Sequence, residues 1–315
     1  MYKVIIDCDT GIDDSIALLY ALKREDVQIM AITAGFGNCS AQQSAQNSLK
    51  MIELAKVKYH IPVYIGSEKT YSGTKPTYAT NVHGTNGIGD VELPLSKQQP
   101  ETEKADDAII RIIHENPHEI ILITLGRMTN LAYALDKDKE IVNLTKKLVF
   151  MGGTILAAGN VGAFSEANIA GDALAAQKVL TAGFNSYQVG LDITQSTHLD
   201  RTHLNYLSAN AKEENKEIAS YINQAMVQYF HFNHQASEMI ECCPVHDPLA
   251  VLIALEPQLA DVTYRPCQVE TAPGLTYGMI VADSRVNHFD APLCGLCLKC
   301  DSEAAVNKLI SIFCN

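Results

Sequence analysis

The chain has 315 residues, of which 47% are hydrophobic and 19% are charged, a composition typical of a globular protein rather than a disordered or fibrous one. It carries 24 Lys and Arg against 36 Asp and Glu, and the resulting net charge of −12 repels polyanions, so we expect no nucleic-acid partner. No apolar stretch approaches the roughly 18 residues that span a membrane, so we expect no membrane partner either.

Residues 1–7 lead directly into a group of carboxylates and lack the charged, apolar and cleavage regions of a signal peptide. We therefore expect a cytoplasmic protein whose nine cysteines are reduced thiols rather than a disulfide framework. Cys294, Cys297 and Cys300 have the spacing of metal ligands, but they lie in a strand-like apolar run without a partner pair at zinc-finger spacing. Buried core thiols are the favoured interpretation.

Strand-like apolar runs alternate with helical patterns along most of the chain. In chain order we expect strands at 4–9, 27–33, 61–65, 119–125 and 147–151, and helices at 13–23, 40–55, after a cap at Thr129, and near 172–181. Towards the C-terminus we expect strands at 267–270, 276–282 and 293–298 and a last helix at 302–313. This alternation predicts an α/β fold, a Rossmann-like open, mainly parallel sheet with helices on both faces. Without a linker or repeat, residues 1–315 are expected to form one domain.

The first predicted strand runs into four carboxylates within eight residues, namely Asp7, Asp9, Asp13 and Asp14. Asp7 and Asp9 point to the same side of a strand, and Gly11 permits a turn that brings the other two into the first turn of a helix. Four neighbouring anions repel one another unless a cation joins them or their pKa values rise. Oxygen-only donors favour a hard ion such as Ca²⁺ or Mg²⁺, so we expect a cation site here.

A rival interpretation is the phosphatase superfamily whose first strand carries D-x-D-x-T or D-x-D-x-V, with the first Asp as the nucleophile. In this chain Gly11 stands at the fifth position, and the Asp13-Asp14 doublet that follows has no role in that motif. No P-loop run occurs, and residues 35–40 lack the third glycine of the dinucleotide fingerprint, which weakens nucleotide-binding interpretations.

Polar residues follow several later strands, where ligands bind in open α/β sheets. They include Asn38 in a glycine-rich turn, His83 in the glycine-rich run 83–90, and a loop with hydrogen-bonding side chains that suit a polyol, Asn160, Glu166 and Asn168. Leu125 could serve a cation only through its backbone oxygen, and Asp172 is best interpreted as a helix cap. Late in the chain, His246-Asp247-Pro248 precedes an apolar helix and offers the distant carboxylate that an oxygen cage needs.

Together these segments resemble the inosine-uridine-preferring nucleoside hydrolase family over essentially the whole chain. The resemblance rests on the acidic opening 7–14, Gly37-Asn38 with Asn47, His83-Gly84, residues 126–130, Met151-Gly152-Gly153, Asn160, residues 166–168 and residues 245–248. Three positions depart from the family pattern, with Thr10 in place of the usual Pro, Arg127 in place of Gly or Pro, and Ala167 where an aromatic residue is often found.

The resemblance implies hydrolysis of the N-glycosidic bond of a ribonucleoside to ribose and free base. It implies one Ca²⁺ per chain held by Asp9, Asp14, Asp247 and the carbonyl of Leu125, with a calcium-bound water activated by Asp9 as general base. His246 would be the acid for the leaving base, and Asp7 would act behind the ligands. The ribose would be held by Asp13, Asn38, Met151, Asn160, Glu166 and Asn168, and His83 is also expected to contact the substrate.

Within the family, the strictly purine-preferring branch stacks the base between Trp side chains and lacks the late histidine. This chain has His246 and no Trp, so we expect a pyrimidine or mixed preference with uridine cleaved. A homo-oligomer, dimer or tetramer, is also expected. Three alternatives stay open: a nucleoside phosphorylase, a D-x-D phosphatase, and a sugar-binding protein of periplasmic type.

Overall fold

The computed structural model describes residues 1–314 and is built around one mixed sheet of nine strands in the order β10-β9-β11-β6-β5-β4-β1-β2-β3. The strands are β1 (Tyr2–Cys8), β2 (Val27–Ala34), β3 (Val63–Ile65), β4 (Ile120–Thr124), β5 (Lys147–Met151), β6 (Ser186–Val189), β9 (Ala260–Val269), β10 (Ile280–Ala282) and β11 (Leu293–Cys300). All pairings from β3 to β11 are parallel, and only β9 and β10 add antiparallel pairs at one edge. The predicted mainly parallel α/β sheet is confirmed.

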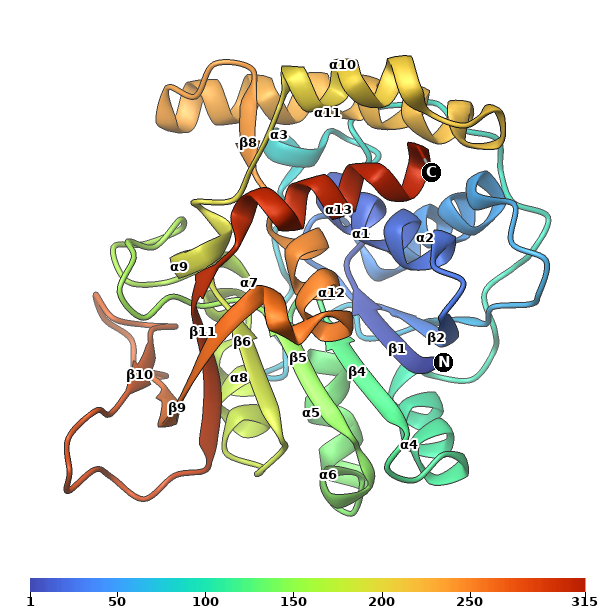
Figure 1. Ribbon diagram of the computed structural model, residues 1–315. Helices are drawn as coiled ribbons and strands as arrows, with labels where there is room; N and C mark the ends of the chain where they lie inside the picture. The colour runs from blue at the N-terminus through green and yellow to red at the C-terminus, as the bar shows by residue number, and fades with distance from the viewer. Residues whose placement is uncertain (315) are drawn as a thin grey trace.

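The central strands are apolar throughout because helices cover both faces of the sheet (Figure 1). One face packs against α1 (Ile12–Lys23), α2 (Ala41–Ala55), α12 (Asp247–Leu255) and α13 (Ser302–Cys314). The other packs against α4 (Ala105–Glu115), α5 (Thr129–Lys137), α6 (Ile141–Leu144), α7 (Ala167–Gly171) and α8 (Ala173–Leu180). Each face therefore has its own hydrophobic core.

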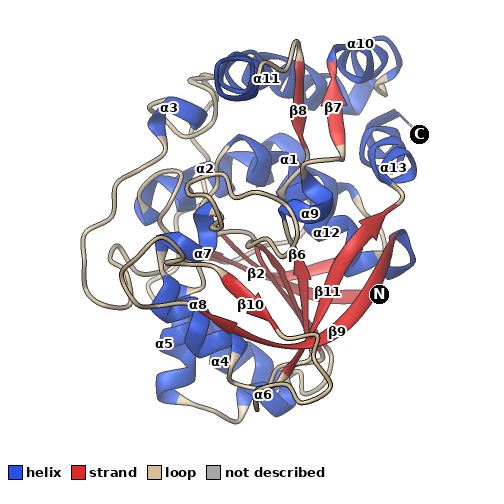
Figure 2. Cartoon of the chain, turned by 90° about the vertical axis from the view of Figure 1, so that its left-hand side faces the viewer, coloured by secondary structure: helices blue, strands red, loops and turns tan. Residues whose placement is uncertain are grey.

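A further layer lies over α1 on the side away from the sheet (Figure 2). It contains α10 (Arg201–Asn210), the long α11 (Lys216–Ser237) and a two-stranded ribbon of β7 (His198–Asp200) and β8 (Cys242–Pro244). Two short helices, α3 (Thr80–His83) and α9 (Leu191–Thr194), link this layer to the sheet side. Among residues 1–314, no helix is both long and apolar enough to cross a membrane.

Most predicted elements fall within a few residues of the observed ones, and two details differ. Thr129 is the first residue of α5 rather than its cap; Met128 holds the cap position, and the Thr129 hydroxyl instead donates to Asp172 Oδ2 at 2.7 Å. The strand expected at 276–282 is ordered as β10 only from Ile280. Gly278 has a φ of 77° and lies against Ala170, where a Cβ would come within 2.6 Å of the Ala170 Cα; the chain bends there, although the Gly278 amide still donates to the Glu270 carbonyl at 2.8 Å.

The cysteines agree with the expectation of core thiols. None of the nine is in a disulfide. Cys294 and Cys297 are three residues apart on β11, so their side chains point to opposite faces and join different cores. Cys300 is only half-buried, and the three thiols do not converge on one point.

Candidate active site

The acidic segment turns from β1 into α1 at the carboxyl edge of the sheet. Gly11 caps α1 in an extended conformation, and its amide donates to Asp14 Oδ2 at 2.8 Å. Asp13 and Asp14 lie in the first helical turn, as predicted. A Cβ on Gly11 would come within 2.5 Å of the Asn38 side chain and 2.7 Å of His83 Nδ1, so only glycine fits between these groups. The turn therefore depends on a residue without a side chain.

Three carboxylates from distant parts of the chain meet there, Asp13, Asp14 and Asp247, and we call them the buried acid cluster. One oxygen of each lies within 4.8 Å of the others, and all three residues are buried. Asp247 is the first residue of α12, which packs along α1 and so places the late carboxylate beside the early pair. Two of the three carboxylates expected to hold a cation, Asp14 and Asp247, thus lie together, with Asp13 rather than Asp9 as the third member of the group.

The buried acid cluster lacks enough hydrogen-bond donors for its oxygens. Asp13 Oδ1 and Asp14 Oδ1 are fully buried and have no hydrogen-bond partner among residues 1–314. Burial raises the pKa of all three carboxyls, and mutual repulsion within the cluster raises the pKa of Asp14 and Asp247 further. A hard cation with oxygen ligands would satisfy these oxygens and remove the repulsion, so the donor set fits such an ion.

The Asp9 carboxylate stands beside this cluster rather than within it. Its Oδ2 accepts from the Asn38 amide at 2.7 Å, and the Asn38 side-chain nitrogen spans Asp9 Oδ1 at 3.4 Å and Asp14 Oδ2 at 2.9 Å. A Cβ on Gly37 would lie 1.8 Å from Asp9 Oδ2, and one on Gly126 would lie 2.8 Å from Asp9 Oδ1. Two glycine backbones thus enclose the carboxylate, and Oδ1 is its less occupied oxygen.

The end of β4 supplies a carbonyl to the same edge of the sheet. Leu125 follows β4, and its oxygen accepts from Asn168 Nδ2 at 2.7 Å. The same amide also reaches the carbonyl of Met151 at 3.2 Å, at the end of β5. A carbonyl oxygen has a second lone pair, so Leu125 keeps acceptor capacity beyond this bond. Asn168 therefore connects the ends of two neighbouring strands.

The other two predicted ribose ligands already have protein partners. Glu166 is fully buried and caps α7, accepting from the amides of Asn168 at 2.9 Å, Ile169 at 3.2 Å and Gly153 at 2.9 Å. Exposed Asn160 accepts from the Ala167 amide at 3.0 Å. Burial raises the Glu166 pKa, although three backbone donors oppose that shift. Asp172 caps α8, as predicted.

His83 ends α3 and is buried against the turn that precedes α1. Its Nδ1 accepts from the Ile12 amide at 3.1 Å, which requires the proton to be on Nε2. Burial lowers the pKa of His83 to about 4. The 3.9 Å approach of Nδ1 to Asp13 Oδ1 is therefore not an ion pair at neutral pH, because the imidazole is neutral.

His246 stands at the N-cap position of α12, next to Asp247. Its Nδ1 lies 2.8 Å from the hydroxyl of Thr194, the last residue of α9. Burial lowers its pKa below the usual 6.5, and the Asp13 carboxylate partly opposes this shift. If the Thr194 hydroxyl donates its proton to Nδ1, the neutral imidazole ring carries its own proton on Nε2.

Asp7 lies behind the site. Its Oδ1 accepts from Thr33 Oγ1 at 2.6 Å and from Asn130 Nδ2 at 2.8 Å. Burial outweighs these bonds and raises the pKa of Asp7 to about 7. The carboxyl thus contacts the end of β2 through Thr33 and the first turn of α5 through Asn130, in keeping with a role behind the ligands.

Sequence reasoning did not single out Tyr229 of α11, whose hydroxyl donates to Asp13 Oδ2 at 3.3 Å across 216 positions of sequence. Nor did it find a role for Arg127, which lies over the Phe36 ring at 4.8 Å and has no hydrogen-bond or ion-pair partner within residues 1–314. No local motif marks the tyrosine. The arginine was visible only as a departure from the family pattern.

Thr10 replaces a proline of the family pattern with a buried hydroxyl. Its Oγ1 contacts Ser48 Oγ at 2.7 Å and accepts from Ser44 Oγ at 3.3 Å, both on α2. Asn47 of the same helix donates to the Thr10 carbonyl at 3.1 Å. The turn is thus held by side-chain hydrogen bonds from α2.

The protein is of the α/β class, with a sheet covered by helices on both faces and an acidic site at its carboxyl edge. Comparisons with known proteins identify its family. The model of the family described as "Inosine-uridine preferring nucleoside hydrolase" matches residues 4–307. The chain therefore belongs to this family and is a nucleoside hydrolase, an enzyme that acts on N-glycosyl compounds.

Two similar proteins are named for pyrimidine nucleosides. Uridine nucleosidase 1 of Arabidopsis thaliana is 33% identical over 91% of this chain and 84% of its own length. The pyrimidine-specific ribonucleoside hydrolase RihA of Salmonella typhi is 29% identical over 89% of this chain and 88% of its own length.

Solved structures of similar proteins share the whole fold. The plant nucleoside hydrolase PpNRh1 has a TM-score of 0.93 at 28% identity, covering 99% of both chains. A purine-preferring ribonucleoside hydrolase from Gardnerella vaginalis has a TM-score of 0.91 at 30% identity, covering 99% of this chain and 98% of the other. The chain is therefore similar both to enzymes named for pyrimidine nucleosides and to an enzyme named for purine nucleosides.

Proposed function

We propose that this enzyme hydrolyses ribonucleosides, uridine among them, to ribose and free base with a calcium ion at the acidic edge of the sheet. The observation that carries the proposal is the buried acid cluster with its two unpartnered oxygens. Buried anions of this kind are stable only when protonated or paired with a cation.

Asp9, Asp14, Asp247 and the carbonyl of Leu125 would hold one Ca²⁺. The ion would supply a water of lowered pKa and anchor ribose hydroxyls when bound. Asp14 Oδ1 then has the partner that it otherwise lacks. The chemical fit rests on a set of oxygen donors without nitrogen or sulfur, which favours a hard ion.

Asp9 would act as the general base. Its Oδ2 is held by the Asn38 amide, while Oδ1 has only the long 3.4 Å contact and can accept a proton from the attacking water. The two glycines leave no side chain between this carboxylate and the edge of the sheet. A positioned base of this kind contributes roughly 10²–10⁴-fold to the rate.

Asp13 would accept a ribose hydroxyl at its unpartnered Oδ1, while Tyr229 holds the other oxygen. The proposed ribose set is completed by Asn38, Met151, Asn160, Glu166 and Asn168, with His83 beside it. Substrate hydroxyls would compete with the intramolecular bonds of Asn160 and Asn168, so these amides would have to exchange partners on binding.

His246 would serve the leaving base. Cleavage of the N-glycosidic bond develops positive charge on the sugar and negative charge on the base, which must gain a proton or a hydrogen bond. With Nδ1 directed at Thr194, His246 can present Nε2–H to the substrate. The absence of Trp, together with this histidine, supports cleavage of pyrimidine or mixed nucleosides.

The test is incubation of the calcium-loaded protein with uridine and with inosine, each with and without inorganic phosphate, and quantification of the sugar products. We expect free ribose from uridine in both conditions. Product formation that requires phosphate and yields ribose 1-phosphate would instead establish a phosphorylase. Turnover of inosine without detectable turnover of uridine would overturn the proposed base preference alone.

A further inference from the structure

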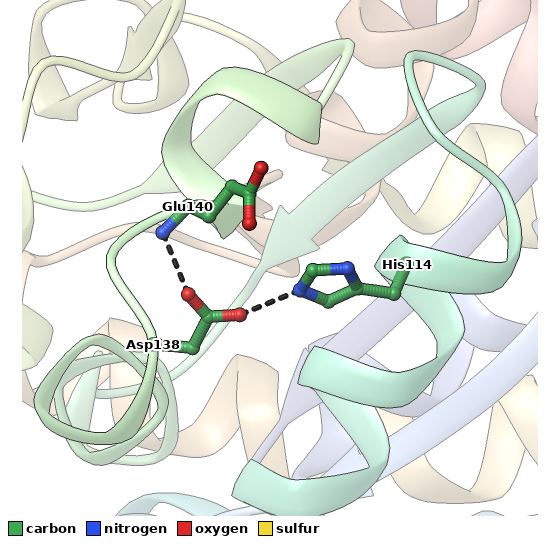
Figure 3. A group of neighbouring side chains, drawn as sticks. All are labelled: His114, Asp138 and Glu140. Carbon is green, nitrogen blue, oxygen red and sulfur yellow. Dashed lines mark hydrogen bonds and ion pairs between the residues drawn. The ribbon is translucent and has the colours of Figure 1, made fainter.

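Three potential metal ligands of mixed chemistry meet at the ends of three helices, far in sequence from the acidic turn. His114 lies in the last turn of α4, Asp138 directly follows α5, and Glu140 precedes α6 (Figure 3). One ligand atom of each lies within 4.8 Å of the other two. We call these residues the surface histidine cluster.

We propose that the surface histidine cluster is a second metal site, one that takes a divalent transition-metal ion, with Zn²⁺ as its probe. This site is separate from the hydrolytic centre and does not depend on the proposed function. An imidazole nitrogen with carboxylate oxygens suits zinc, whereas calcium prefers oxygen ligands alone.

The carboxylates of this cluster are free of competing cations. Neither Asp138 nor Glu140 pairs with a Lys or Arg among residues 1–314, and the nearby Lys137 is already paired with Asp106 at 2.7 Å and Asp107 at 2.6 Å. An incoming ion therefore displaces no salt bridge to lysine or arginine. It would displace only the proton between His114 and Asp138.

The geometry requires little movement. His114 Nε2 lies 2.6 Å from Asp138 Oδ2, while two ligands of a tetrahedral zinc ion stand about 3.4 Å apart, so the pair must separate by roughly 0.8 Å. The Glu140 amide donates to Asp138 Oδ1 at 2.8 Å and orients that carboxylate. His114 and Glu140 are exposed, so both side chains can adjust, and the remaining coordination position faces water.

A bound ion would connect α4 to the α5–α6 turn on the helical layer formed by α4, α5, α6 and α8. We therefore expect zinc to raise the unfolding temperature of the calcium-loaded enzyme without changing its turnover.

The experiment is titration of calcium-saturated protein with Zn²⁺, comparing the wild type with His114→Gln and with His60→Gln. His60 pairs with Glu101 at 3.0 Å and belongs to no group of three ligands within residues 1–314, which makes it a matched control. We expect His114→Gln to weaken binding of one zinc equivalent by about ten-fold or more and to abolish the thermal shift, because loss of even an indirect ligand partner costs 10–100-fold.

His60→Gln should leave both readouts unchanged, and all three proteins should hydrolyse uridine equally. Equal zinc affinity in the wild type and His114→Gln would overturn the proposal, as would no saturable binding by the wild type. Displacement of the zinc by millimolar Ca²⁺ would also overturn it, since the cluster would then be a nonselective acidic patch.

Discussion

Residues 1–314 contain two groups of side chains that could ligate a metal ion, and the surroundings of these two groups are opposite. The buried acid cluster contains only carboxylates, and two of its oxygens have no partner within residues 1–314. In the surface histidine cluster, water reaches the ligands, and Asp138 already bonds to an imidazole and a backbone amide. A cation bound at the buried acid cluster would supply interactions that its oxygens lack. A cation bound at the surface histidine cluster would instead replace hydrogen bonds that already exist.

This difference predicts how each group affects the protein. Burial removes the hydration that stabilises a carboxylate, so we expect folding and catalysis to depend on whether the buried acid cluster holds a cation. Exposed charges remain solvated, and their interactions contribute little stability on their own. The comparison can be tested by making equivalent changes at the two places.

The largest effect is expected from Asp9→Asn, which keeps the size of the side chain but removes its ability to take a proton. We expect kcat for uridine to fall by roughly 10²–10⁴-fold while the fold persists. Asp138→Asn is the matched control, because it makes the same chemical change in the surface histidine cluster and should leave kcat unaltered. Steady-state kinetics and circular dichroism measure both. Turnover of Asp9→Asn within a few-fold of wild type would remove Asp9 from the role of base.

A smaller effect should separate His246 from its neighbour Asp247. His246→Ala is expected to lower uridine turnover while calcium content stays intact, because the change removes only the group that serves the leaving base. A riboside with p-nitrophenol as leaving group needs no proton and should restore much of the rate. Asp247→Ala should not be rescued, because it removes a carboxylate of the buried acid cluster.

If His246→Ala is impaired equally on uridine and on p-nitrophenyl riboside, then His246 binds the substrate or packs against its neighbours instead of serving the leaving group.

The pH dependence of uridine turnover tests the protonation state of His246. Burial keeps the His246 pKa below 6.5, so a protonated His246 acid would make uridine turnover decline as pH rises above that pKa. A neutral Nε2–H donor would leave the rate level between pH 6.5 and 8.

Local patterns predicted the parts of the site that lie next to one another in sequence. The β1–α1 turn was predictable because strand alternation, Gly11 and the first helical turn act over a few residues. The end-of-strand rule for parallel sheets predicted where Asn38 and Leu125 would lie. The short β6, with its polar Ser186 and Gln188, shows no apolar run and was missed.

Contacts between distant elements could not be predicted in this way. Tyr229 reaches Asp13 only because α11 packs over α1, and Thr194 reaches His246 only through the placement of α9. The bonds of Thr10 with α2 also depend on packing that periodicity does not report. Resemblance to a family supplied candidate roles for Asp247 and His246, but no periodic pattern would have paired them with the first turn of α1.

The smallest expected effect, a change in the pH dependence of stability, tests the buried acid cluster without reference to catalysis. Burial raises the pKa of its carboxyls, so without a cation the folded state binds more protons than the unfolded chain above the usual carboxyl pKa of 3.8. Stability must then fall as pH rises, by about 1.4 kcal/mol per pH unit for each extra proton held.

From pH 6.5 to 8.5 these carboxyls act together with the other buried acids of raised pKa, Asp7, Asp9 and Glu166, and with buried thiols such as Cys8 and Cys39, all of which make stability fall as pH rises. The depressed pKa values of His83 and His246 affect stability only below about 6.5, where they act with the opposite sign. Protein treated with a calcium chelator should therefore lose stability across this window, as measured by urea unfolding. Saturating calcium should reduce the slope by holding the carboxylates ionised, and Asp7, with a pKa of about 7, should contribute a residual slope that Asp7→Asn removes.

His114→Gln should leave the effect of calcium on this slope unchanged, because His114 lies outside the buried acid cluster. The decisive comparison is the chelated wild type against its calcium-loaded form. If stability of the chelated protein does not fall between pH 6.5 and 8.5, its cluster carboxylates are already ionised without a cation. Burial of the ligands would then not explain why one site depends on its ion and the other does not.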